Sequence, residues 1–362
     1  MKGYGMVIVE EAGWLEKPKP TPGPLDAIIK PTVVAPCSSD THVLHGGAGP
    51  KEDLILGHEA IGIVDSVGKA VKNFKKGDKV VVPCVTPDWL STGVQNTKTF
   101  SHDAYVMSSF KFLGSKDGTF AEFFHVNQAD ANLVKFPEAG VSDEAALMTT
   151  DMMSTGFHAA ELAEVEYGDT VLVIGIGPVG LMAVAAAQLK GAGRIIAVGT
   201  RPICIEVART YGATDFINYK EGDVAEQVMQ LTDGRGVDCT IIAGGAGDSL
   251  NTAIMATRAT GVIASVNFYD INDKLSIPTL AWGLGMSHKD IRCGFCPGGA
   301  ERIRRMLELI ANGRIDPSKL VTHRFYGFDK IPDAFKLMDK KAPDLIKPVI
   351  YLDQEEPKSV NK

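Results

Sequence analysis

An apolar run that ends in three spaced glycines constrains this chain more than any other feature. Residues 171–174 read Val-Leu-Val-Ile, Gly175, Gly177 and Gly180 follow, and strong helix formers occupy 181–189. This order predicts a strand, a tight turn and a helix. The first glycine permits the turn, the second lets a pyrophosphate approach the backbone, and the third lets helix pack on strand. Because the helix N-terminus offers free N–H groups to phosphates, we expect a dinucleotide site here.

The end of the next apolar segment indicates which dinucleotide binds. Residues 194–198 predict a strand, and Gly199, Thr200 and Arg201 follow it. An NAD site usually has Asp or Glu about 20 residues past the glycines, whereas an NADP site has room for the 2′-phosphate and an Arg. Gly199 and Thr200 leave that room, and Arg201 can pair with the phosphate as a planar fork. The pattern therefore favours NADP, with an Arg201 that only solvates a strand end as the alternative.

Length and composition narrow the class of protein. A chain of 362 residues exceeds the roughly 250–300 residues at which single cores stop growing, so we expect two domains. The net charge of −7 and the lack of basic clusters argue against nucleic acid as a partner. Six cysteines in so long a chain are no disulfide framework. The apolar stretch 170–189 is broken by glycine and proline, so we expect no membrane span. Residues 1–6 lead into acidic residues without an apolar core or cleavage site, so we expect no secretory signal and a cytoplasmic location.

The order of predicted elements indicates an α/β fold. Residues 1–151 read as short β-rich segments with turns, whereas strands and helices alternate from 152 to 296. Such alternation predicts a doubly wound parallel sheet with right-handed crossovers. Residues 297–362 add a helix and a final strand. The expected strands are 26–35, 62–67, 79–83, 171–174, 195–198, 215–218, 239–243, 261–266 and 347–352, and the expected final helix is 300–310.

Three separated side chains are candidates for a zinc site. Cys37, His58 and Asp151 carry a thiolate, an imidazole and a carboxylate, and a catalytic zinc takes three such ligands and keeps one position open. Their spacing alone does not unite them. On local chemistry alone, a cysteine such as Cys37 is more often a buried core thiol, and an aspartate such as Asp151 is more often a helix cap.

Several motifs resemble those of a known family, and this resemblance assigns the three residues to one site. Gly57-His58-Glu59-x-x-Gly62, closed by Gly68, resembles the zinc signature of the medium-chain alcohol dehydrogenases. The chain is most similar to the NADP-dependent secondary-alcohol dehydrogenases of anaerobic bacteria and protists. That similarity is carried by segments 35–42, 86–89, 122–127, 151–158 and 320–323.

The resemblance implies a GroES-like, β-rich catalytic domain over 1–151, a Rossmann NADP-binding domain over 152–296, and a return to the catalytic domain over 297–362. It implies Cys37, His58 and Asp151 as zinc ligands. Glu59 is either a weak fourth ligand or a carboxylate that orients the metal-bound His, and the two are equally supported. Many relatives hold a structural zinc with four clustered Cys after about residue 90. Since no Cys lies between Cys84 and Cys204, we expect one catalytic zinc and no structural zinc.

The activity that the resemblance implies is reversible oxidation of short secondary alcohols, such as 2-propanol, to ketones. Zinc would polarise the substrate oxygen while hydride passes to or from the nicotinamide. The resemblance also implies a proton relay from the substrate oxygen through Ser39 to His42 or the cofactor ribose. Ser39 and His42 lie within one helical turn of each other. A capping Ser and a surface His are the alternative. The implied assembly is a homotetramer.

Further site residues follow from the same resemblance. Tyr219 can stack on adenine, although a core Tyr is the competing interpretation. The other implied cofactor contacts are Ile176, Gly177, Pro178, Val179, Gly199, Thr200, Arg201, Val266, Asn267, Phe268 and Lys341. The implied substrate wall comprises Cys84, Trp89, Phe110 and residues near Cys293–Cys296. Two rival functions stay open, namely a zinc-free NADPH-dependent quinone or enone reductase of the same architecture, and an NADP-binding protein without turnover.

Overall fold

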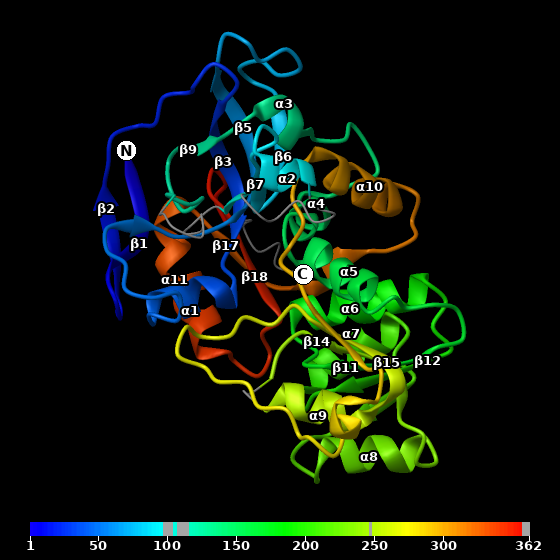
Figure 1. The fold of residues 1–362 in the computed structure, drawn as a ribbon. Helices are drawn as coiled ribbons and strands as arrows, with labels where there is room; N and C mark the ends of the chain where they lie inside the picture. The colour runs from blue at the N-terminus through cyan, green and yellow to red at the C-terminus, as the bar shows by residue number, and fades with distance from the viewer. Residues whose placement is uncertain (97–103, 107–115, 246–247, 357–362) are drawn as a thin grey trace, which may run out of the picture. The chain divides into compact units, whose positions relative to one another are not determined.

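A computed structural model describes residues 1–96, 104–106, 116–245 and 248–356 (Figure 1). The chain divides into two units, Met1–Asp151 with Pro297–Lys362, and Met152–Cys296. The two ends of the chain therefore belong to the same unit. Each unit has its own sheet system and its own core.

The first unit is built mainly from β-strands. Its strands are β1 (Lys2–Ile8), β2 (Glu11–Glu16), β3 (Ala27–Ala35), β4 (Leu54–Ile55), β5 (Glu59–Val67), β6 (Lys79–Val82), β7 (Val85–Pro87), β8 (Ala104–Val106), β9 (Phe124–Val126), β10 (Val134–Lys135), β17 (Val321–Tyr326) and β18 (Lys347–Tyr351). Its helices are α1 (Ser38–Leu44), α2 (Thr92–Asn96), α3 (Ala129–Asn132), α4 (Asp143–Thr149), α10 (Ala300–Ala311) and α11 (Ile331–Lys340), with 3-10 turns at Pro317–Leu320 and Phe328–Lys330.

The C-terminal segment contributes two neighbouring strands, β17 and β18, to the main sheet of this unit. The strand order of this sheet is β10-β6-β5-β3-β18-β17, and β9 also pairs with β3. β18 runs antiparallel to β3, with Ile350 opposite Val34, and parallel to β17. Ile29 and Val34 of β3 are fully buried in the core, as is Ile350 of β18. Because each such side chain contributes about 1.5–3 kcal/mol when buried, the last strand is an integral part of this core.

The second unit contains a parallel sheet. Its strands are β11 (Thr170–Ile174), β12 (Arg194–Val198), β13 (Asp215–Ile217), β14 (Val237–Ile242), β15 (Thr257–Ser265) and β16 (Asp290–Cys293). Its helices are α5 (Met152–Leu162), α6 (Pro178–Leu189), α7 (Pro202–Thr210), α8 (Val224–Leu231) and α9 (Ser249–Ala256), with a 3-10 turn at Gly283–Gly285. The order β13-β12-β11-β14-β15-β16 is that of a Rossmann sheet. The predicted doubly wound parallel sheet is therefore confirmed.

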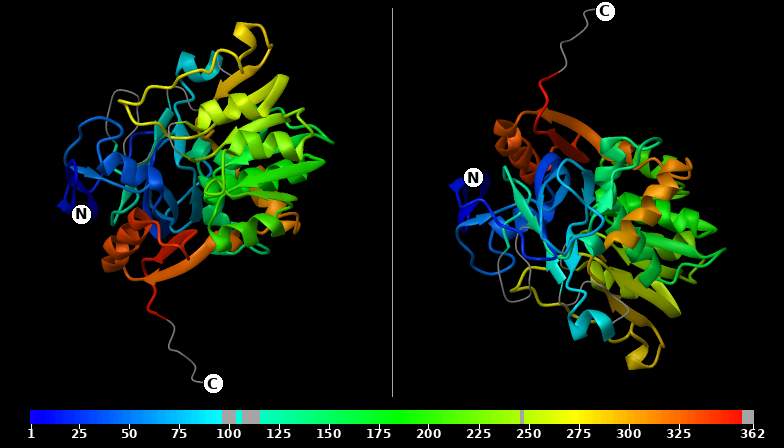
Figure 2. Two further views of the ribbon diagram at one scale, coloured as in Figure 1. Left: turned by 90° about the horizontal axis from the view of Figure 1, so that it is seen from below. Right: turned by 90° about the horizontal axis from the view of Figure 1, so that it is seen from above.

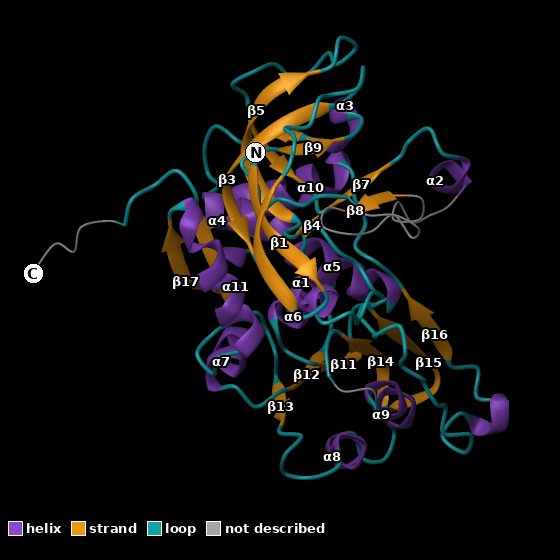
Figure 3. Ribbon diagram, turned by 90° about the vertical axis from the view of Figure 1, so that its left-hand side faces the viewer, coloured by secondary structure: helices purple, strands orange, loops and turns teal. Residues whose placement is uncertain are grey.

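Alternating side chains of these strands pack against helices on the two faces of the sheet. Leu172 and Ile174 of β11 pack with Val228 of α8 and Ile254 of α9 on one face. Figure 3 shows α8 and α9 on that face and α5, α6 and α7 on the opposite one. Figure 2 shows the strands of this sheet side by side, in green to yellow. Both faces are covered, which explains why the strand sequences are continuously apolar.

One strand of this sheet was not predicted. β16 reads Asp-Ile-Arg-Cys and is largely exposed. It lies at the edge of the sheet, paired only with β15 among the described strands. A short edge strand with charged residues lacks the apolar run by which the inner strands were recognised. Among the described residues, no helix has the length and apolar character needed to cross a membrane.

Candidate metal and cofactor sites

Strand register brings the two halves of the candidate metal site together. β3 and β5 are antiparallel, and Ala35 at the end of β3 lies opposite Glu59 at the start of β5. Cys37 therefore follows one strand, and His58 precedes the other, at the same end of the sheet. A residue in α1 then joins the two segments.

That residue is Asp40, whose carboxylate is completely buried. Its Oδ2 accepts the backbone N–H of Cys37 at 2.9 Å, and its Oδ1 accepts that of Gly57 at 3.1 Å. Its Oδ1 also lies 3.0 Å from Nδ1 of His58. Burial alone would raise the pKa of Asp40, but His58 and the two backbone donors outweigh it and lower that pKa. Asp40 thus orients the His58 ring so that Nε2 faces away from it.

Nε2 of His58 faces a group of metal-binding atoms. Single donor atoms from Cys37, His58, Glu59 and Asp151 all lie within 4.8 Å of one another. Oδ2 of Asp151, which follows α4, is 3.2 Å from Nε2. Burial opposes a charge on His58, but Asp40, Asp151 and Cys37 outweigh it and raise its pKa well above the usual value. The sulfur, nitrogen and oxygen donors of this cluster are those that zinc prefers.

Glu59 is the fourth member of this cluster and is fully buried. Its Oε1 forms an ion pair with Nζ of Lys347 in β18 and is 3.9 Å from Nε2 of His58. Its Oε2 is buried without a hydrogen-bond partner among the described residues. Burial raises the pKa of Glu59 to about 7, against the opposing charge of Lys347. An unsatisfied buried acceptor beside three ligand-type side chains fits a cation in this site.

The two candidate relay residues lie on α1. Oγ of Ser39 is 3.3 Å from Nε2 of His58, so its hydroxyl faces the donor cluster. His42 is half-buried one helical turn further along. The spacing therefore places both side chains on the same face of α1.

The predicted cofactor residues of the second unit gather at one edge of its sheet. Gly175 to Gly180 follow β11, Gly199 to Arg201 follow β12, Tyr219 follows β13, and Val266 to Phe268 follow β15. These are the carboxyl ends of parallel strands, where open α/β sheets bind ligands. Lys341, by contrast, lies in the first unit, at the C-terminal end of α11.

The glycine turn has the geometry that the pattern predicts. Gly175 has a φ of +88°, and a Cβ there would lie 2.8 Å from Cα of Gly244. A Cβ on Gly180 would lie 1.9 Å from the carbonyl oxygen of Gly175. Gly177 caps α6, and a Cβ there would meet no atom within 4 Å. Packing against the protein itself thus requires glycine at positions 175 and 180. Gly177 instead leaves open space at the N-terminus of α6, which begins with Pro178.

The end of β12 has a polar surface. Oγ1 of Thr200 donates to the hydroxyl oxygen of Tyr219 at 3.3 Å. Arg201 precedes α7 in an extended conformation and is half-buried. Tyr219 is 53% exposed, so it is not a core tyrosine. The exposed ring is free to stack on a flat ligand.

The expected substrate-wall residues are divided between the units. Cys84 is buried in the first unit and donates its backbone N–H to the carbonyl of Thr150, next to Asp151. Trp89 is half-buried in the same unit, with its Nε1 donating to Asn132 at 3.1 Å. Phe110 lies outside the described residues. In the second unit Cys293 is exposed at the end of β16 and Cys296 is buried.

Sequence reasoning missed three residues of these sites. Asp40 was detectable as the third residue of the helix that Cys37 caps. Lys347 was detectable as a charge at the start of an otherwise apolar strand. Gly244, which packs on Gly175, was detectable only as a glycine that follows a strand.

Comparisons with known proteins show which family the chain resembles. The model of the alcohol dehydrogenase GroES-like domain matches residues 23–138, and that of the zinc-binding dehydrogenases matches 178–312. The NADP-dependent isopropanol dehydrogenase of Thermoanaerobacter brockii is 54% identical over 97% of this chain and 100% of its own. The protein of the same name from Entamoeba histolytica is 49% identical over 98% of this chain and 97% of its own.

Solved structures have the same fold. A zinc-dependent alcohol dehydrogenase from Streptococcus pneumonia superimposes with a TM-score of 0.86 at 30% identity, covering 99% of this chain and 100% of its own. An alcohol dehydrogenase from Thermus sp. ATN1 gives a TM-score of 0.84 at 28% identity, covering 97% and 100%.

Proposed function

Because this chain belongs to the zinc-containing medium-chain alcohol dehydrogenase family, we propose that it catalyses the NADP-dependent, reversible oxidation of short secondary alcohols to ketones, with 2-propanol and acetone as a substrate pair. The observation that carries this proposal is the cluster of Cys37, His58 and Asp151 donor atoms. The names of the relatives support the cofactor and the substrate class. The first unit is then the catalytic domain, and the second is the NADP-binding domain.

The residues of the first unit have distinct roles in this proposal. Cys37, His58 and Asp151 would hold one zinc ion per subunit, with Glu59 beside them. Bound there, zinc supplies a Lewis acid that lowers the pKa of an alcohol and polarises a ketone. Asp40 maintains the His58 ring orientation. The Ser39 hydroxyl accepts the proton of the alcohol and passes it towards His42, which exchanges it with solvent. Such positioned proton transfer typically contributes roughly 10²–10⁴-fold in rate.

The residues of the second unit bind and orient the dinucleotide. The N-terminus of α6 provides N–H groups for the pyrophosphate. Gly199 and Thr200 accommodate the 2′-phosphate, Arg201 pairs with it, and Tyr219 stacks on the adenine. Val266, Asn267 and Phe268 follow β15 at the same sheet edge and contact the nicotinamide half. Lys341 is the remaining residue for which the family resemblance implies a cofactor contact.

The decisive experiment is NADPH consumption with acetone, measured before and after treatment with a strong zinc chelator. We expect turnover that chelation abolishes and added Zn²⁺ restores, with NADH a much poorer cofactor. Asp151→Asn should lower turnover and zinc content together. Turnover of enones that is indifferent to chelation would instead support the zinc-free reductase. NADPH binding without turnover of any alcohol or ketone would support the non-catalytic alternative.

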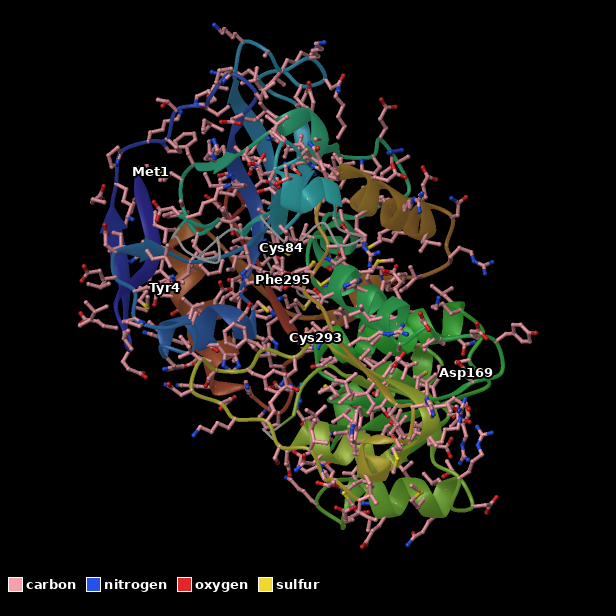
Figure 4. All side chains as sticks on the ribbon, viewed as in Figure 1. Met1, Tyr4, Cys84, Asp169, Cys293 and Phe295 are labelled. Carbon is pink, nitrogen blue, oxygen red and sulfur yellow. The ribbon has the colours of Figure 1, made fainter. Side chains whose placement is uncertain are left out.

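We also propose that the subunits form a homotetramer. β16 is an edge strand whose Ile291 and following Phe295 are exposed, and Figure 4 labels Phe295 near Cys293. The segment before this strand exposes further large apolar side chains, namely Ile271, Leu275, Ile277, Leu280, Leu284 and Met286. So many exposed large apolar side chains along one segment support an interface between subunits. Light scattering that gives the mass of a monomer would contradict the proposal.

The cysteines support a proposal about the compartment. No disulfide joins any of the six in the described part of the chain, and cysteines without disulfides suit a reducing compartment. We propose the cytoplasm, and fractionation that finds the protein outside it would contradict this.

A further inference from the structure

A fully buried lysine contacts Glu59, one of the four residues of the candidate metal site. Lys347 in β18 and Glu59 in β5 both have side chains with no exposed surface, and they form an ion pair through Nζ and Oε1. Removing an ammonium group from water costs several kcal/mol, so a buried lysine persists only when a negative charge compensates it. The sheet brings this pair together over 288 residues of sequence separation. A strand that served only to fill the apolar core would not need the charged Lys347 at this position.

The pair is electrostatically part of the donor cluster. The Glu59 oxygen that Lys347 holds is also the one 3.9 Å from Nε2 of His58. The ion pair therefore places a buried positive charge beside the donor cluster, on the side of Glu59.

The net charge and the coordination number of the zinc site suggest a role for the Lys347 ammonium group. One thiolate and two carboxylates carry more negative charge than a zinc ion neutralises, and the excess is unfavourable in a buried site. Four protein ligands would also close a tetrahedral zinc site, whereas catalysis needs an open position. Both problems are removed if Glu59 is bound to a second cation instead of the metal.

We propose that Lys347 is a positioning residue that holds Glu59 back from the metal, so that Cys37, His58 and Asp151 are the ligands and the fourth position stays open for substrate. This inference rests on the proposed function, since it requires a metal in this site. Oε2 of Glu59 keeps an unused acceptor, so loss of the ammonium frees a carboxylate that can move onto the metal.

The test uses the full-length protein with Co²⁺ in place of zinc, because the visible spectrum of Co²⁺ reports its ligands. Imidazole serves as the probe for an open position. In the unaltered protein, imidazole should shift the spectrum. In Lys347→Met, Glu59 should occupy the fourth position, and the imidazole dissociation constant should rise roughly 10–100-fold, as for other residues that support metal ligands. The KM for acetone should rise with it.

Three further variants separate this role from a purely structural one. Lys347→Arg keeps the charge and should keep the imidazole response. Lys347→Met combined with Glu59→Gln removes the competing ligand and should restore the response. If Lys347→Met does not fold, Lys347→Gln, which retains a neutral hydrogen-bond donor, takes its place. A structural role alone would lower the melting temperature of the metal-free protein without changing the imidazole response.

The outcomes distinguish the two proposals. A wild-type protein that binds no stoichiometric zinc would overturn the proposed function. A zinc-containing wild type, with an unchanged imidazole response in Lys347→Met, would overturn only the role of Lys347. A response lost in Lys347→Met and restored in the double variant would support it.

Discussion

The Oδ1 oxygen of Asp40 lies 3.0 Å from Nδ1 of His58, and the same carboxylate accepts the backbone N–H groups of Cys37 and Gly57. One buried side chain thus joins both strand ends that carry metal-binding residues. Its position in α1 couples helix capping to the geometry of the metal site.

We expect Asp40→Asn to weaken zinc binding roughly 10–100-fold, the usual cost of removing a carboxylate that orients a metal-bound His. The measurement is zinc transfer to a chromophoric chelator. Asp65→Asn, on the partly exposed end of β5 and paired with Lys19, is the matched control and should retain its zinc. Equal zinc loss in both variants would show that Asp40 has no special role.

The glycines of the α6 turn should respond differently to the same change. Gly175→Ala adds a Cβ at φ +88° and 2.8 Å from Gly244, and we expect it to cost about 1–3 kcal/mol of unfolding free energy. Gly177→Ala meets no protein atom within 4 Å, so it should fold normally and lose NADPH affinity. Gly168→Ala has a similar φ of +86° in open space and isolates the backbone cost. Denaturant unfolding and NADPH titration together test all three.

Arg201 should determine the preference for NADP over NAD. Arg201→Ala removes charge-assisted hydrogen bonds worth about 1.5–3 kcal/mol, which is roughly a 10- to 150-fold loss in NADPH affinity. NADH affinity should change little, because NADH lacks the 2′-phosphate. Arg209→Ala, on the same helix with its guanidinium over Phe216, is the control. A parallel loss for NADPH and NADH would place Arg201 outside the phosphate site.

His45 should make part of the stability depend on pH. Its Nδ1 lies 2.6 Å from Glu10 and its Nε2 3.0 Å from Asp339, and these hydrogen bonds raise its pKa above 6.5. A raised pKa in the folded state means that the stabilisation is full below pH 6.5 and is lost as pH rises through the higher value. Below about pH 4 the carboxylates are protonated and the gain also disappears.

The variant His45→Gln should therefore melt at a lower temperature than the unaltered protein in mildly acidic buffer. The difference should vanish in alkaline buffer. Because His45 is exposed, we expect no more than about 1 kcal/mol. A difference that is constant with pH would mean that His45 acts through packing.

Much of the second unit was predictable, because its information is local. The apolar runs at β11 and β12 and the glycines between strand and helix follow directly from the order of residues. β16 was missed because an exposed edge strand has no apolar periodicity. The start of β15 at Thr257 was also missed, because polar residues at this end pair with Val237 of β14.

The geometry of the candidate metal site, in contrast, could not be predicted from local sequence patterns. Motifs and a family resemblance named Cys37, His58, Glu59 and Asp151, but no local rule sets their separation. Their proximity depends on the register of β3 with β5 and on the packing of α4, both of which are long-range. Lys347 comes from the last strand, where the sequence shows a charge at the start of an apolar run but gives no sign of its partner Glu59.

The sequence by itself determined the elements whose residues are neighbours along the chain, namely the glycine turn, the inner apolar strands of the second unit, and the small residues and arginine after β12. Only the tertiary structure decided which distant side chains share a buried volume, such as Asp40 with His58 and Lys347 with Glu59. The physical reason is that turn and strand preferences act over a few residues, whereas buried charges must be compensated by whichever groups the packed sheet brings within hydrogen-bonding distance.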